Sequence, residues 1–157
     1  MNIAYKQTSQ NSKFIKASPG KIYHAFTSPE ALEAWQAPGN MTGRVHSFDL
    51  RVGGGYQMSL YYPVSTEGSQ GKTTEKEDRF TVRFLELLPS KKIVQSVNFD
   101  SPDQAFAGEM TMEVTFEEAG EGTNVTIFFQ NIPTGIRPED NEAGTKSSLE
   151  KLAGYVE

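Results

Sequence analysis

The stretch that most constrains the fold is residues 138–157, the longest segment of the chain with a helical pattern. Its apolar side chains recur at spacings of four, three and four residues, which places them on one face of an α-helix. Two glycines, Gly144 and Gly154, each lower the stability of such a helix by about 1 kcal/mol relative to alanine. The helix therefore needs a surface to pack on, and we expect the preceding residues to build a sheet that holds it. The apolar face consists of Thr145, Leu149, Leu152 and Val156.

Two residues are candidates for the start of this helix. Pro138 suits the first helical position, and the acidic residues that follow it favour the positive N-terminal end of the helix dipole. Asn141 is an alternative N-cap, which would shorten the helix by one turn. The polar residues off the apolar face are expected to be solvated, and they are Lys146, Ser147, Glu150 and Lys151.

The N-terminal part of the chain predicts one strand and two short helices. Residues 13–17 (KFIKA) form a short strand candidate behind a polar start. Ser18-Pro19 and Ser28-Pro29 each place an N-cap residue before a proline at the first helical position. We therefore expect two short helices in succession, ending near Pro38.

From residue 45 to residue 130, apolar and polar side chains mostly alternate, which is typical of half-buried β-strands. The clearest case is residues 110–117 (MTMEVTFE). The alternation breaks at residues 85–88, which indicates a β-bulge, and the polar residues 65–76 predict a loop. Because short turns join most of the strands, we expect antiparallel pairing.

Together these patterns predict an α+β fold. We expect a curved antiparallel sheet of about six or seven strands wrapped around the long C-terminal helix, with two short helices after the first strand. The length of 157 residues predicts a single domain over residues 1–157.

Composition excludes several classes of protein. The net charge of −5 argues against a nucleic-acid surface, which needs clustered Lys and Arg. No apolar run approaches the roughly 18 residues that a membrane span requires. The chain has no cysteine, so it holds no disulfide framework and no thiolate site, and we expect a cytoplasmic protein.

Several short motifs follow one another in a fixed order. They are residues 27–30 (TSPE) ahead of Trp35, residues 35–39 (WQAPG), residues 49–56 (DLRVGGGY) and residues 86–89 (ELLP). Their order resembles the START-like (SRPBCC, helix-grip) superfamily, and within it the branch named after the activator of heat-shock-protein-90 ATPase. Gln36 and Thr145 stand where that branch usually has tryptophan near the cavity mouth, so a wider or more polar pocket is expected.

This resemblance implies a helix-grip domain with an internal cavity for a small apolar ligand. The name of the branch also implies a chaperone as a partner and a role in the stress response. No cofactor is implied, and a homodimer is left open.

The inward-facing apolar residues form the predicted ligand site, between the sheet and the C-terminal helix. Methionine and aromatic linings suit adaptable apolar pockets, so we predict binding of a small hydrophobic or amphipathic ligand. The alternative for the same residues is a filled core. Tyr56 and Gln130 are candidates for polar contacts, provided that Gln130 does not face outward. The predicted lining is Trp35, Tyr56, Met58, Phe99, Met110, Met112, Phe129, Leu149 and Leu152.

The sequence assigns no catalytic and no metal-ligating residue. His24 and His46 lie on different elements, without metal-ligand spacing. Residues 53–55 (GGG) predict a tight turn, since no helix follows to cradle a phosphate. Asp49 and Arg51 share a strand face, as a structural ion pair or as an anchor for a polar ligand group.

The alternative function is a cyclase- or hydrolase-like reaction in the same cavity. It needs a positioned acid or base, for which Tyr56, Glu86 and His46 are the candidates.

Overall fold

The protein is described here by a computed structural model over residues 7–63 and 77–157, so the loop predicted for residues 65–76 lies outside the described residues. The elements, in chain order, are β1 (Ser9–Ile15), α1 (Pro19–Phe26), α2 (Pro29–Trp35), β2 (Thr42–Asp49), β3 (Gly55–Tyr61), β4 (Glu77–Leu88), β5 (Lys92–Phe99), the short 3-10 helix η2 (Gln104–Phe106), β6 (Met110–Ala119), β7 (Gly122–Gln130) and α3 (Pro138–Val156).

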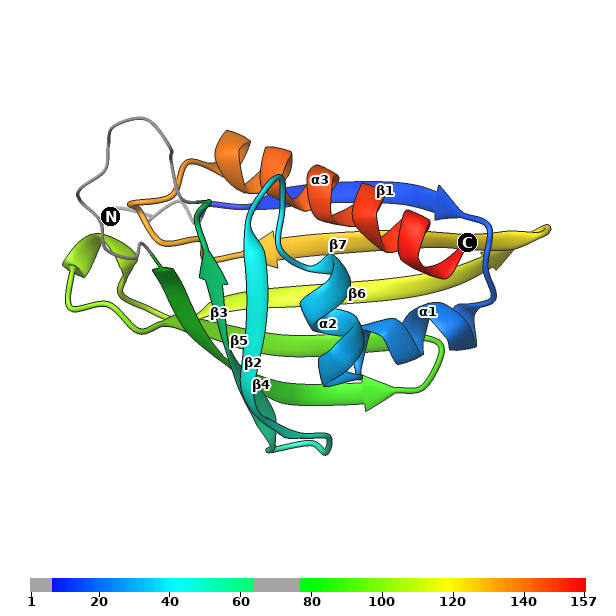
Figure 1. Ribbon diagram of the computed structural model, residues 1–157, viewed down its shortest axis with the longest axis horizontal. Helices are drawn as coiled ribbons and strands as arrows, with labels where there is room; N and C mark the ends of the chain where they lie inside the picture. Colours follow the sequence, from blue (N-terminus) through cyan, green and yellow to red (C-terminus); the bar gives the residue numbers. More distant parts are fainter. Residues whose placement is uncertain (1–6, 64–76) are drawn as a thin grey trace, which may run out of the picture.

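The seven strands form one antiparallel sheet in the order β1-β7-β6-β5-β4-β3-β2. Strands β2 to β7 each pair with their neighbour in the chain, whereas β1 crosses over to pair with β7. The sheet curves around α3, and α1 and α2 lie near the same face (Figure 1). The predicted α+β fold is confirmed, including the two short helices after the first strand.

Two β-bulges shape the sheet. The register between β4 and β5 shifts between Phe84 and Glu86, which confirms the bulge predicted from the broken alternation. A second shift falls between Val45 and Ser47 on β2, where the sequence predicted only an extended segment. An extra residue at such a point increases the local twist and bends the strand.

The three α-helices begin as their prolines predict. The hydroxyls of Ser18 and Ser28 accept the N–H groups of Lys21 and Ala31 at 3.2 and 3.4 Å. Pro138 opens α3, and its N-cap residue makes no side-chain cap. The alternative start at Asn141 is wrong, because the residue lies inside the helix and its carbonyl accepts the Thr145 hydroxyl at 2.8 Å.

Helices lie along both edges of the sheet. Helix α3 packs beside β1, and α2 packs beside β2. On the β2 edge, the Glu33 carboxylate accepts the N–H of Val45 at 2.7 Å. These contacts protect edges that would otherwise present unpaired backbone groups to another chain.

The core lies between the sheet and the helices. Trp35 is 2% exposed, its indole N–H donates to the carbonyl of Ala25 at 2.8 Å, and its ring meets Phe26 edge-on. The predicted apolar face of α3 is buried as expected. Lys151 was expected to be solvated; instead it is half-buried and donates to the carbonyl of Ala37.

None of the helices in the described ranges combines the length and apolarity needed to cross a bilayer.

Candidate functional site

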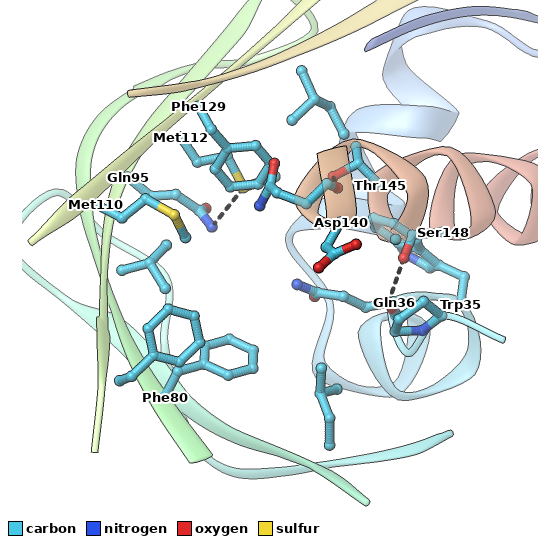
Figure 2. Close-up of a pocket in the computed structure, with 17 residues that line it drawn as sticks. Trp35, Gln36, Phe80, Gln95, Met110, Met112, Phe129, Asp140, Thr145 and Ser148 are labelled. Carbon is cyan, nitrogen blue, oxygen red and sulfur yellow. Dashed lines mark hydrogen bonds between the residues drawn. The ribbon is translucent and has the colours of Figure 1, made fainter. Parts of the chain in front are cut away.

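A cavity of about 200 Å³ lies between the N-terminal half of α3 and the concave face of the sheet (Figure 2). Its wall combines apolar side chains of the sheet, the residues that end α2 and the first turns of α3. The lining consists of Trp35, Gln36, Pro38, Leu60, Phe80, Gln95, Val97, Phe99, Met110, Met112, Ile127, Phe129, Asp140, Asn141, Gly144, Thr145 and Ser148.

The volume of the cavity limits the size of molecule that would fit. Drug-sized ligands occupy pockets of about 300–1,000 Å³, whereas an engineered apolar cavity of about 150 Å³ binds benzene. A volume of about 200 Å³ therefore suits a molecule built around one ring or a short branched chain. Met110 and Met112 lie on its sheet side (Figure 2), and their flexible side chains can adapt to the shape of such a guest.

Five of the nine predicted lining residues border this cavity. They are Trp35, Phe99, Met110, Met112 and Phe129.

The other four are buried but belong to the core around it. Tyr56 packs against Phe48 and Phe84, with ring centroids 5.5 and 5.9 Å away. The methyl group of Met58 occupies the space above Gly43, where an added Cβ would meet it at 2.6 Å. Leu149 and Leu152 lie further along α3, in the half that closes the core.

Gln95 is a polar lining residue that the predicted set omitted. It is 4% exposed, and its amide donates to the sulfur of Met112 at 3.5 Å (Figure 2). The signal was present in the sequence, because Gln95 interrupts the apolar alternation of Ile93, Val97 and Phe99. Gln130, the other candidate for a polar contact, is exposed and does not line the cavity.

Gln36 places an incompletely paired amide in the wall. Its backbone carbonyl accepts the Ser148 hydroxyl at 2.7 Å, while its side-chain oxygen Oε1 is buried without a hydrogen-bond partner. A buried polar atom left without a partner costs about 1–3 kcal/mol. Figure 2 shows this side chain reaching into the space between α3 and the sheet. Gln36 and Thr145, which stand where the family branch usually has tryptophan, both border the cavity.

Tyr56 lies just behind the wall. Burial raises the pKa of its hydroxyl to about 12, and the nearby amides of Gln95 and Gln36 act in the opposite direction. A phenol with this pKa stays protonated at neutral pH. It can hold a hydrogen bond but does not supply a base.

The other candidate acid–base residues have separate partners. The ring nitrogen Nε2 of His46 lies 2.8 Å from the Ser59 hydroxyl. The carboxylate of Glu86 pairs with Lys92 at 3.7 Å. Neither residue borders the cavity, so the structure does not bring the three candidates Tyr56, Glu86 and His46 together at it.

The turn between β2 and β3 contains the Asp49–Arg51 pair and the glycines predicted to form a tight turn. Arg51 and Asp49 form an exposed ion pair at 2.8 Å. Gly53 has a φ of 89°, as a tight turn requires, and an added Cβ on Gly55 would meet the carbonyl oxygen of Val82 at 1.8 Å. Within residues 7–63 and 77–157, no three His, Asp or Glu side chains gather closely enough to hold a metal ion.

Comparison with known proteins finds a family and several structures. The family model described as "Activator of Hsp90 ATPase homolog 1-like protein" matches residues 16–157. No curated protein matches the chain.

The solved structures that resemble the chain include bacterial proteins of similar length. One from Chromobacterium violaceum is 30% identical, with a TM-score of 0.83 over 96% of each chain. One from Rhizobium loti is 26% identical, with a TM-score of 0.70 over 96% of this chain and 97% of that one. An AHSA1-like protein from Aeromonas hydrophila, at 19% identity, shares the fold with a TM-score of 0.67 over 95% of this chain and 91% of its own.

Proposed function

The chain belongs to the Activator of Hsp90 ATPase homolog 1-like family, and from this premise we propose that it binds a small, mainly apolar molecule beneath the first half of α3. The observation that carries the proposal is the cavity of about 200 Å³ between that half-helix and the sheet. An enzymatic role for the cavity and a chaperone partner stay predictions.

The lining supplies the main driving force for binding. Burial of apolar surface contributes about 25 cal/mol per Å², so a ring that buries about 150 Å² gains roughly 4 kcal/mol. This gain alone corresponds to a dissociation constant of about 1 mM. Tighter binding therefore needs polar contacts as well, and Gln36 and Gln95 supply amide groups for them at the wall.

Gly144 offers a direct test of the site. It borders the cavity, and the nearest atom to an added Cβ is the Cγ of Pro38, 4.0 Å away. A Gly144→Leu side chain can therefore enter the cavity without a backbone clash. Gly154→Leu makes the same replacement on the same helix, at a position where an added Cβ meets nothing within 4 Å.

The experiment compares uptake of an environment-sensitive apolar dye by the wild type and both variants. We expect Gly144→Leu to weaken dye binding by about tenfold or more, which is about 1.4 kcal/mol, and Gly154→Leu to leave it unchanged. Circular dichroism checks that each variant is folded. Equal dye binding by folded Gly144→Leu and Gly154→Leu would place the binding site elsewhere and refute the proposal.

A further inference from the structure

We propose that the ligand's polar end donates hydrogen bonds and is neutral or positively charged, as in a short arylalkyl alcohol or arylalkyl amine, and that carboxylates are rejected. The inference rests on the proposed function and adds the chemical class of the ligand. It follows from the charge of the wall and from the hydrogen bonds that its polar groups already make.

The only formal charge among the described lining residues is negative. Asp140, in the first turn of α3, borders the cavity, as does Gln36 at the end of α2 (Figure 2). No Lys, Arg or His is among the lining residues of the described ranges. The side chain of Arg137 is 73% exposed, its guanidinium lies 3.8 Å from the Glu139 carboxylate, and it is not among the lining residues. A carboxylate ligand would thus meet the charge of Asp140 with no cation among the described lining residues, since the nearby Lys151 ammonium is engaged at the Ala37 carbonyl.

The hydroxyl donors of the helix wall are already engaged. Thr145 donates to the carbonyl of Asn141 at 2.8 Å, and Ser148 donates to the carbonyl of Gln36 at 2.7 Å. The N–H groups of Asp140 and Asn141 both donate to the carbonyl of Arg137. The start of α3 therefore does not offer these groups to an anion, although helix N-termini are often anion sites.

Hydrogen-bond acceptors, in contrast, remain available. The Oε1 atom of Gln36 is buried without a partner, and the Asp140 carboxylate is exposed at the mouth. The side-chain amide of Asn141 still contains N–H donors, and that of Gln36 lies against the Tyr56 hydroxyl, but both amides are neutral. A ligand O–H or N–H that reaches Gln36 supplies the missing partner, and a positive charge gains further from Asp140.

Three one-ring probes of similar shape test this inference: phenethyl alcohol, phenethylamine and phenylacetate. Their affinities are measured by NMR titration of the intact protein. We expect the alcohol and the amine to bind, and phenylacetate to bind at least about tenfold more weakly than the alcohol. Since Asp140 is exposed, the preference for the amine should shrink as the salt concentration rises.

Matched variants distinguish the contribution of the Asp140 carboxylate from that of the Gln36 amide. Asp140→Asn should lower the affinity for phenethylamine by about two- to fivefold and leave that for phenethyl alcohol unchanged. Glu139→Gln, one residue earlier and 73% exposed, should change neither. Gln36→Met keeps the length of the side chain and should weaken binding of the alcohol.

The outcomes distinguish the inference from the proposed function. If phenylacetate binds as tightly as the amine, and the Gly144→Leu variant loses both, the ligand class is wrong while the binding site stands. If none of the three probes and no dye binds to the folded protein, the proposed function is wrong, and the inference about the ligand class is wrong as well.

Discussion

The hydroxyl of Ser148 on α3 donates a hydrogen bond of 2.7 Å to the backbone carbonyl of Gln36, the C-cap residue of α2. The two residues are 112 positions apart in the chain, and both border the cavity. This bond therefore connects the last helix to the end of α2 at the wall of the candidate site.

Removal of this bond should destabilise the fold. Ser148→Ala leaves the carbonyl of Gln36 without that donor, and we expect the free energy of unfolding to fall by about 1–2 kcal/mol in urea titrations. The control is Ser147→Ala, which removes an acceptor of the exposed Gly39 N–H at 2.9 Å and should cost less. If both variants lose the same free energy of unfolding, the Ser148 hydrogen bond contributes no more to stability than the exposed Ser147 one.

The last turn of α3 can be stabilised by one substitution. Gly154 is exposed, and an added Cβ would meet nothing within 4 Å. Gly154→Ala should raise the free energy of unfolding by about 0.5–1 kcal/mol, because alanine has the higher helix propensity. Thermal unfolding measures the change, and a lower midpoint than that of the wild type would contradict the prediction.

Glu33 should protect the β2 edge of the sheet. Glu33→Ala frees the N–H of Val45, so we expect about 1 kcal/mol lower stability and faster aggregation in light scattering. Glu33→Gln keeps an oxygen acceptor at the same place and should restore part of the loss. Indistinguishable Ala and Gln variants would argue against this role of the hydrogen bond.

Tyr56 should make the fold sensitive to alkaline pH. Burial raises its pKa to about 12, whereas tyrosine in an unfolded chain ionises near about 10. As pH rises through this interval, the unfolded chain loses the proton first, so the stability falls.

The measurement is the free energy of unfolding at about pH 9 and about pH 11. Tyr56→Phe cannot ionise, and its loss of stability between these two values should be smaller than that of the wild type by roughly 1 kcal/mol. Tyr155→Phe, at a half-exposed ring, is the control for the loss of a hydroxyl. A Tyr56→Phe variant with the same pH dependence as the wild type would refute the prediction.

The fold was predictable because its signals are local. The Ser-Pro pairs start α1 and α2, Pro138 starts α3, and alternation marks the strands. The broken alternation also located the bulge at residue 85. The second bulge, on β2, left no such signal, because the segment around His46 lacks a clear alternation to break.

The candidate site was predictable only in part. Alternation tells which face of the sheet a residue occupies, but not how far along the strand it lies from the helix. Met58 and Met112 therefore looked equivalent in the sequence, although only Met112 borders the cavity. Ser148 was missed because a search for apolar periodicity passes over small polar residues, and its partner is a backbone carbonyl that no sequence pattern marks.

The two halves of α3 are under different constraints. Up to Ser148, the helix presents small or polar side chains to the cavity; beyond it, Leu149, Leu152 and Val156 are buried in the core. Substitutions in the early turns would therefore change the wall of the cavity, while the later turns keep the chain folded. A chain of this architecture can thus vary the lining of the cavity without first having to acquire compensating changes in the core.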